Sequence, residues 1–449
     1  MRGALRLEIG AGLFWSGRYQ RDLRRPAAGG TVRQRTSRSS KVEPGGSGMI
    51  FAGGPAARHL WILFAILVAG RGPAAATGLS LRERIETRGF PSVFQAWAPA
   101  EVPDEPPDRT LARHDLVWGG PWLLGLEWEQ GTGEPATRFR PDTVERARRR
   151  RQELLRLNPH LVLLCEIRYR DAPADALGGL DHPWWLRDER GRVVPGWAEG
   201  GFYRLDFRLE SFRRHAAARA AAATEAALFD GILLDWWDEG ERFSGQPLLP
   251  ARTNLLAAIR AAIGPDKLIL VNVNDRRVPA SAPWINGLFM ECYDTSTPEK
   301  WRVIMDTLRW AEATLQRPPA NCVEFWPRPA HADLDRMRAV TTLVLTHSDG
   351  YCLFSHPDDL PTPDHRHRWY PFWNKRLGRP LGPGETRPDD AVWRRFEGGV
   401  AVFNPLGNRP VTVRFDTPMR RVATDRTGRT HTVPPGDGDL FQPVRVISR

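Results

Sequence analysis

Lysine is scarce in this chain, and its scarcity changes how the net charge is interpreted. Only four of the 64 basic residues are lysine, so arginine supplies almost all of the positive charge. The formal net charge of +11 would suggest a phosphate-bearing partner such as a nucleic acid. However, residues 1–48 carry +7 of it and residues 49–76 another +2, which leaves +2 for everything that follows. The body of the protein is nearly neutral, and we expect no nucleic-acid partner.

Long apolar runs and closely spaced cysteines are also missing. No run reaches the roughly 18–20 residues that a membrane-spanning helix needs. The four cysteines include no C-x-x-C pair, which argues against zinc ribbons and iron–sulfur clusters. Each lies inside an apolar run, so we expect buried free thiols. A bridge between Cys292 and Cys322 is the alternative in an oxidising compartment.

The first 76 residues have the composition of a leader. Residues 1–48 are rich in Gly, Ser and Arg without a periodic apolar pattern, so we interpret them as a disordered extension from a misassigned start. Residues 49–76 open on Met49 and combine a basic residue, a ten-residue apolar run and an Ala-x-Ala site, which are the parts of a secretory signal peptide. We therefore expect a secreted or periplasmic chain from about Thr77, with no stable membrane insertion after cleavage. The alternative is a buried core helix or a short membrane anchor.

Eight short apolar runs follow the leader and alternate with helical patterns. The runs are continuously apolar, as strands buried on both faces should be. Eight strands linked mostly by helices predict an α/β fold, a closed (β/α)8 barrel over residues 77–380, although the first crossover lacks a clear helical pattern. The predicted strands lie at residues 91–97, 114–118, 160–166, 231–237, 268–274, 285–291, 321–326 and 351–355. The predicted helices lie at residues 142–157 (with Asp142 as N-cap), 208–229, 252–263, 298–315 and 332–346.

The pattern changes after Pro380. Short runs with alternating polarity, separated by Asn-Pro, Gly-Asn and Thr-Gly turns, predict a small antiparallel β-sandwich domain at residues 385–449. Its strands are expected at residues 399–403, 410–415, 421–424 and 444–447.

Carboxylates end four of the predicted barrel strands. Glu166, Asp235 and Glu291 end the third, fourth and sixth runs, and Glu324 lies in the seventh. Barrel enzymes carry their catalytic groups at the carboxyl ends of the strands, where these four side chains should meet. We predict that Asp235 and Glu291 are the catalytic pair, while the choice of acid among the three glutamates stays open.

Aromatic residues accompany these carboxylates, and tryptophan is frequent, with 18 in the chain. Glycoside hydrolysis needs one carboxylic acid to protonate the leaving oxygen and a second carboxylate to attack the sugar or activate water, while flat rings stack on sugar faces. Histidine is almost absent from the run ends, so we expect neither a metal nor a cofactor, and we expect the pair His365 and His367 to be solvated. The predicted substrate-binding residues are Glu166, Trp236, Trp237, Asp238, Asn274, Tyr293, Glu324 and Trp326.

The stretch from Asp230 to Trp237, Asp-Gly-Ile-Leu-Leu-Asp-Trp-Trp, resembles the fourth-strand motif of uncharacterised glycosyl hydrolases with TIM barrels. These families are distantly similar to the α-amylase and α-galactosidase clans, whose nucleophilic Asp ends strand four, so the resemblance implies that Asp235 is the nucleophile. The α-galactosidase clan places its acid after strand six, where this chain has Glu291 in place of the clan's Asp. The α-amylase clan uses a Glu at strand five, where this chain has Asn272 or Asn274, and this argues against an amylase.

The resemblance covers roughly residues 90–449, because the stretch from Gly398 to Pro405 looks like the β-sandwich that follows such barrels. The leading hypothesis is a secreted glycoside hydrolase acting on an oligo- or polysaccharide. The alternatives are a non-catalytic carbohydrate-binding barrel and a metal-dependent hydrolase. Sugar identity, linkage, stereochemical outcome and oligomeric state do not follow from the sequence.

Overall fold

The computed structural model describes residues 78–129, 135–197, 200–326, 334–355 and 365–444. From Leu79 onward these residues belong to one unit. The predicted leader and signal peptide lie outside the described residues. Within the described ranges, no helix has both the length and the apolar character needed to cross a membrane.

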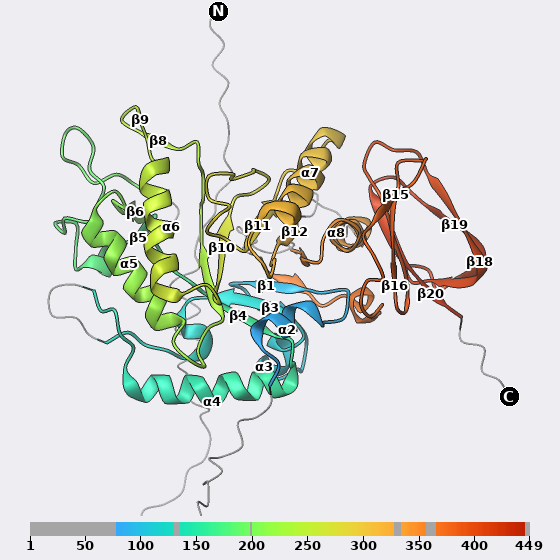
Figure 1. Cartoon of the computed structure of the whole chain (residues 1–449), viewed down its shortest axis with the longest axis horizontal. Coiled ribbons are helices and arrows are strands. Elements are labelled where there is room, and N and C mark those ends of the chain that lie inside the picture. The colour runs from blue at the N-terminus through green and yellow to red at the C-terminus, as the bar shows by residue number, and fades with distance from the viewer. Residues whose placement is uncertain (1–77, 130–134, 198–199, 327–333, 356–364, 445–449) are drawn as a thin grey trace, which may run out of the picture. The chain divides into compact units, whose positions relative to one another are not determined.

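Eight parallel strands form a barrel, and all eight predicted strands are confirmed (Figure 1). Their order in the sheet follows their order in the chain, and a parallel bridge between Val93 and Cys352 links the first strand to the last. The strands are β1 (Phe94–Ala96), β3 (Leu116–Gly119), β4 (Val162–Glu166), β7 (Gly231–Leu234), β10 (Leu268–Asn272), β11 (Gly287–Cys292), β12 (Cys322–Phe325) and β13 (Tyr351–Phe354).

Helices connect most of these strands, and the five predicted helices are confirmed. The first crossover holds only a five-residue helix, which explains why the sequence shows no clear pattern there. No helix joins β10 to β11, a departure from the regular (β/α)8 pattern in this fully described segment. The helices are α2 (Leu81–Glu86), α3 (Pro107–Leu111), α4 (Pro141–Leu157), α5 (Glu210–Ala223), α6 (Leu249–Ile263), α7 (Pro298–Thr314) and α8 (Leu334–His347).

The prediction that Asp142 caps α4 is wrong by two residues. Pro141 takes the first helical position, where its missing N–H costs nothing, so Arg140 is the N-cap. Asp142 lies in the first turn and pairs with Arg146 at 3.0 Å. A carboxylate there still interacts favourably with the helix dipole.

Three aromatic rings fill the barrel interior below the carboxyl ends of the strands. Phe94 of β1, Trp118 of β3 and Phe289 of β11 are fully buried. Phe289 contacts Trp118 at 4.8 Å and Phe94 at 5.8 Å between ring centroids. Because β1 and β11 are not neighbours in the sheet, these contacts cross the barrel. We call these three rings the aromatic floor. Glu291 follows Phe289 by two residues on the same strand, so it points inward above this floor.

All four cysteines are buried free thiols, as expected. The alternative bridge between Cys292 and Cys322 is not formed. In the β11–β12 pairing Cys322 lies opposite Phe289, and Cys292 lies opposite Phe325, so the two thiols are three positions apart along the strands.

Charged side chains are buried at the other end of the barrel, before the strands begin. Asp230 is 3% exposed, and its carboxylate accepts hydrogen bonds from Arg84 of α2, from Arg151 of α4 at 2.6 Å and from the Leu163 N–H at 3.0 Å. Burial alone would raise the pKa of Asp230, but the two guanidinium groups hold it below its usual value. Gly231 follows because a Cβ there would collide with the carbonyl oxygen of Leu268.

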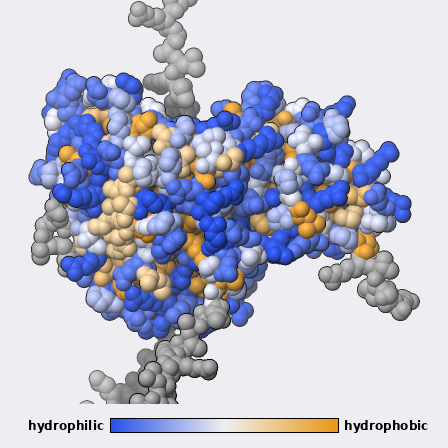
Figure 2. Space-filling model, in the orientation of Figure 1, coloured by the Kyte–Doolittle hydropathy of each residue, from blue (hydrophilic) through white to orange (hydrophobic). Residues whose placement is uncertain are grey.

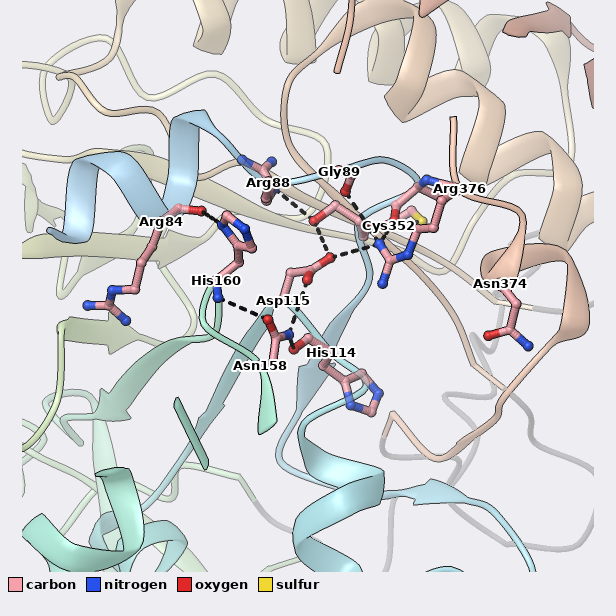
Figure 3. Close-up of polar contacts among 12 residues, drawn as sticks. Arg84, Arg88, Gly89, His114, Asp115, Asn158, His160, Cys352, Asn374 and Arg376 are labelled. Atoms are coloured by element: carbon pink, nitrogen blue, oxygen red, sulfur yellow. Dashed lines mark hydrogen bonds and ion pairs between the residues drawn. The ribbon is translucent and has the colours of Figure 1, made fainter. Parts of the chain in front are cut away.

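A second buried carboxylate lies at this end. Asp115 accepts from Ser92 Oγ at 2.9 Å and from Asn158 Nδ2 at 3.2 Å, with Arg376 3.6 Å away. Figure 3 shows Asp115 at the centre of this polar network. It lines a hollow of about 460 Å³. Each buried aspartate at this end therefore has an arginine partner, so neither leaves an uncompensated charge in the core.

The C-terminal strands form one antiparallel sheet in the order β15-β16-β17-β20-β18-β19. The predicted sandwich would have two hydrogen-bonded sheets, whereas all six strands here belong to a single sheet. This sheet has its own small core, which includes Val402, Val413 and Phe441. Arg338 of α8 pairs with Asp437 of this sheet at 2.7 Å. The strands are β15 (Glu385–Thr386), β16 (Val392–Phe396), β17 (Gly399–Asn404), β18 (Val411–Arg421), β19 (Thr427–Val433) and β20 (Asp437–Pro443).

Two of the four strands predicted for this domain are confirmed. The run at 399–403 is β17, and the run at 410–415 is the first half of β18. The run at 421–424 is instead the end of β18 and a turn. Of the last run, Val444 follows β20, and residues 445–447 lie outside the described residues.

Asp230→Asn should destabilise the protein by about 3–5 kcal/mol, because it leaves Arg84 and Arg151 without the charge that compensates their burial. Denaturant unfolding measures this loss. Glu145→Gln, which removes an exposed partner of Arg149, is the control and should change stability by less than about 1 kcal/mol. Equal effects of the two substitutions would contradict a structural role for Asp230.

Candidate active site

One amide joins the two predicted catalytic carboxylates. Asn272, the last residue of β10, donates from Nδ2 to Oδ1 of Asp235 at 2.8 Å and to Oε2 of Glu291 at 2.9 Å. The strand order β7-β10-β11 places Asn272 between the strands that carry the other two residues. The two accepting oxygens cannot be farther apart than the sum of these distances, so the structure brings Asp235 and Glu291 together at one rim.

The backbone beside Asp235 is held in an uncommon conformation. Trp236 has φ 56°, in the left-handed region that bulky side chains rarely adopt. Its N–H donates to Asp235 Oδ1 at 2.9 Å, and its carbonyl accepts from the Tyr169 hydroxyl at 2.9 Å. Trp97 after β1 and Asn274 after β10 have φ 42° and 55°. Such strain gathers at functional sites, and here it lies at the same end of three barrel strands.

Glu166 is the third carboxylate at this rim. Trp97 donates from Nε1 to Glu166 Oε2 at 2.9 Å, and the exposed Arg168 lies 3.6 Å from Oε1. Glu166 is 9% exposed. Its side chain is therefore held in place, with its charge close to Asp235.

Burial and neighbouring charges give the two predicted catalytic carboxyls different pKa values. Burial raises the pKa of Asp235 to about 6, and the charge of Glu166 adds to this, while the Asn272 hydrogen bond opposes it. Burial raises the pKa of Glu291 to about 7; His365 lowers it, and the carboxylates of Glu324 and Asp235 raise it. Near neutral pH, Asp235 is thus mostly ionised while much of Glu291 keeps its proton, a division of roles typical of acid–base catalysis.

Glu324 lies beside Glu291 but does not reach solvent. The two residues are opposite each other in the β11–β12 pairing, and Glu324 is fully buried. It accepts a hydrogen bond from Ser355 Oγ, and its Oε2 lies 2.8 Å from His365 Nδ1. The expectation that His365 and His367 are solvated is wrong, since they are 7% and 0% exposed.

Two predicted sugar-binding aromatic residues are exposed at the rim. Trp236 is 53% exposed and Tyr293 is 62% exposed, and no other aromatic residue is among the exposed large hydrophobic side chains of the described chain. They follow Asp235 and Glu291 closely in the chain. Arg170 lies 4.5 Å above the Trp236 ring, and Trp326 contacts the Tyr293 ring at 6.4 Å.

Figure 2 shows that hydrophilic residues cover most of the visible face, with apolar residues in small groups.

The structure places Trp237 away from the rim. Its side chain is 1% exposed and donates from Nε1 to Ser281 Oγ at 2.9 Å, so it packs in the core and cannot stack on a ligand. Both tryptophans follow the end of β7, and the left-handed backbone at Trp236 breaks the regular alternation of a strand, so Trp236 is exposed while Trp237 turns into the core.

The two remaining predicted residues, Asp238 and Asn274, lie near the rim with partners of their own. Asp238 pairs with Arg276 at 2.8 Å. The Asn274 N–H donates to Asn272 Oδ1 at 3.3 Å and so helps to orient the bridging amide.

Among the residues that the structure describes, the rim encloses little space. The hollow lined by Glu166, Arg168, Asp235 and Trp236 has a volume of about 10 Å³, much less than the hollow at the opposite end. The strained backbone, the shifted carboxylates and the exposed rings all lie at the carboxyl rim, and we therefore place the site there. In the part of the chain that the structure describes, no three His, Cys, Asp or Glu side chains form a metal-binding group.

Residues 172–400, about half of the chain, match the family described as hypothetical glycosyl hydrolase family 15. The chain belongs to this family. The match includes β7, β10, β11 and β12, which carry Asp235, Asn272, Glu291 and Glu324. No curated protein matches the chain.

Solved structures with a similar fold include several glycosidases. A noncanonic maltogenic α-amylase from Thermotoga neapolitana is 12% identical, with a TM-score of 0.46 over 81% of this chain and 99% of that one. A GH27 β-L-arabinopyranosidase from Geobacillus stearothermophilus is 13% identical, with a TM-score of 0.47 over 82% and 99%. An isomalto-dextranase from Arthrobacter globiformis is 11% identical, with a TM-score of 0.43 over 82% and 75%.

Glu291→Gln should stabilise the protein at pH 8 by up to about 3 kcal/mol and have little effect at pH 5. The pKa of Glu291 in the folded protein, about 7, is above its ordinary value. The folded state therefore loses stability as the pH rises from the ordinary pKa through about 7, because Glu291 must ionise in an unfavourable place. A neutral amide escapes this cost. Denaturant unfolding at both pH values measures the difference.

The control for this measurement is Glu189→Gln, which changes an exposed glutamate. It should leave the pH dependence of unfolding as in the wild type. If Glu291→Gln destabilised the protein equally at pH 5 and pH 8, the side chain would have a packing role and its burial would not oppose ionisation.

Proposed function

We propose that this protein is a glycoside hydrolase that cleaves its substrate with retention of configuration, with Asp235 as nucleophile and Glu291 as acid and base. The observation that supports retention is the shared donor Asn272, which holds one oxygen of each carboxylate within 2.9 Å of a single nitrogen. Retaining enzymes place their carboxyl groups about 5–5.5 Å apart, whereas inverting enzymes leave about 6.5–9.5 Å for a water molecule.

In the first step, Asp235 attacks the anomeric carbon while Glu291 gives its proton to the departing oxygen. The hydrogen bonds from Asn272 and Trp236 both go to Oδ1 of Asp235, which leaves Oδ2 as the attacking atom. The glycosidic bond breaks, and an ester forms between the sugar and Asp235. In the second step, the Glu291 carboxylate takes a proton from water, the resulting nucleophile attacks the same carbon, and the ester bond to Asp235 breaks.

Exposed rings on both sides of the pair suit a carbohydrate. Sugar rings have apolar faces that stack on aromatic side chains, and Trp236 and Tyr293 offer such faces next to Asp235 and Glu291.

We also propose that the mature chain acts outside the cytoplasm. The support is the signal-peptide pattern of residues 49–76. N-terminal sequencing of the exported protein should find a start near Thr77, and an intact Met49 on exported protein would contradict cleavage at this site.

The mature protein should hydrolyse at least one member of a panel of polysaccharides and aryl glycosides, with the highest kcat/KM between about pH 6 and pH 7. Activity should rise through the pKa of about 6 of Asp235, which must be ionised, and fall through the pKa of about 7 of Glu291, which must be protonated. Glu291→Gln should reduce kcat/KM by about 10²–10⁴-fold on substrates with poor leaving groups, and Asp235→Asn by at least as much.

Asp306→Asn, on the exposed face of α7, is the matched control and should keep full activity. Full activity of Asp235→Asn would overturn the assignment of the nucleophile. Sugar binding without any turnover across the panel would favour the alternative, a non-catalytic carbohydrate-binding barrel.

A further inference from the structure

A buried carboxylate and imidazole lie behind Glu291 and take no part in the steps above. Glu324 is fully buried and is held by the Ser355 hydroxyl and by His365 Nδ1 at 2.8 Å. His365 is itself 7% exposed. A buried carboxylate is costly unless it is paired and hydrogen-bonded, and both of its oxygens are engaged here.

The sheet register places this pair beside Glu291. Glu291 and Glu324 are opposite residues of the neighbouring strands β11 and β12, so their side chains point to the same side of the sheet. The charged or titratable groups that act on Glu291 are His365, Glu324 and Asp235. The carboxylate of Glu324 favours the protonated form of Glu291, and the imidazole of His365 favours the ionised form. The two members of the pair thus act on Glu291 in opposite directions.

The position of His365 is fixed from several sides. Its φ of 65° lies in the left-handed region, and its ring packs on Trp97 at 4.9 Å and on Phe289 of the aromatic floor at 5.7 Å. Its carbonyl accepts a hydrogen bond from His367 Nδ1 at 3.0 Å. His367 Nε2 in turn lies 2.8 Å from the Nε2 of the buried His114. A strained backbone persists only where its surroundings hold it, as they do here.

We propose that His365 and Glu324 form a positioning pair that lets Glu291 both release and recover its proton during one catalytic cycle. The proposal rests on the proposed function, in which Glu291 must be neutral in the first step and ionised in the second. Glu324 favours the neutral form, and His365 favours the ionised form. Neither residue is placed to touch the substrate, because Glu324 is fully buried and His365 is only 7% exposed.

The test is a titration of the Glu291 carboxyl carbon by ¹³C NMR in the full mature chain, which needs no substrate. The Glu291 signal is the one missing from the spectrum of Glu291→Gln. In His365→Gln its titration midpoint should rise by about half to one pH unit, and in Glu324→Gln it should fall by a similar amount. If His365→Gln does not fold, Glu324→Gln alone decides, because the proposal fixes the sign of its shift.

A structural role alone would not produce shifts of opposite sign. Shifts in the same direction, or none in folded variants, would overturn the proposal. Kinetics give a second reading. With an activated aryl leaving group and a pH below the pKa of Glu291, His365→Gln should lower kcat by about 3- to 10-fold, because the second step needs ionised Glu291, and should leave kcat/KM within about twofold. A wild type with no turnover would contradict the proposed function, while the titration would still decide whether the pair controls the proton of Glu291.

Discussion

The candidate site depends on one side-chain amide. Asn272 donates both of its Nδ2 hydrogens to carboxylates, one to Asp235 and one to Glu291. An amide is suited to this place because it has two donors on one nitrogen and no charge of its own. A cation there would lower the pKa of both carboxyls, and an apolar side chain would remove the hydrogen bond to Glu291 and leave Asp235 with only the Trp236 N–H as donor. The position of Asn272 between the two acids follows directly from the order of the strands in the sheet.

The site works against the stability of the fold, and other parts of the barrel compensate. Burying Asp235 and Glu291 raises the pKa of both, so each costs free energy when it ionises. The aromatic floor excludes water below them, which is also why their charges interact strongly. At the opposite end, Asp230 and Asp115 are buried with arginine partners and stabilise the starts of the strands. The two ends of the barrel thus use buried carboxylates for different purposes.

The sequence predicts the barrel well because its signals are local. Each strand is a short apolar run, and a carboxylate at the end of a run must lie at the common rim, whatever the details of packing. The ends of the fourth and sixth runs therefore place Asp235 and Glu291 at the same rim. The sequence also indicates a place for Asn272, because this residue lies near the end of the predicted strand between the two strands that carry Asp235 and Glu291. Its dual hydrogen bond, however, depends on side-chain distances that spacing along the chain does not specify.

What the sequence could not predict depends on long-range packing. His365 lies among arginines in the sequence and reads as a surface residue, yet a contact with Glu324, 41 residues away, buries it. Trp236 and Trp237 are adjacent and equally aromatic, and the left-handed backbone turn at Trp236, which the sequence does not reveal, leaves the first exposed and the second in the core. In the C-terminal sheet, strands with several charged and polar residues were missed because their pairing, more than their composition, makes them strands.

The most direct test of the account is to trap the covalent intermediate. A panel of activated 2-deoxy-2-fluoro glycosides forms long-lived esters with retaining enzymes, because the fluorine slows both steps while the activated leaving group keeps the first step fast. Mass spectrometry of the labelled protein should find one sugar per chain, attached to Asp235, and no label on Asp235→Asn. A label on Glu291 or Glu166, or hydrolysis with inversion and no label on any residue, would contradict the central claim.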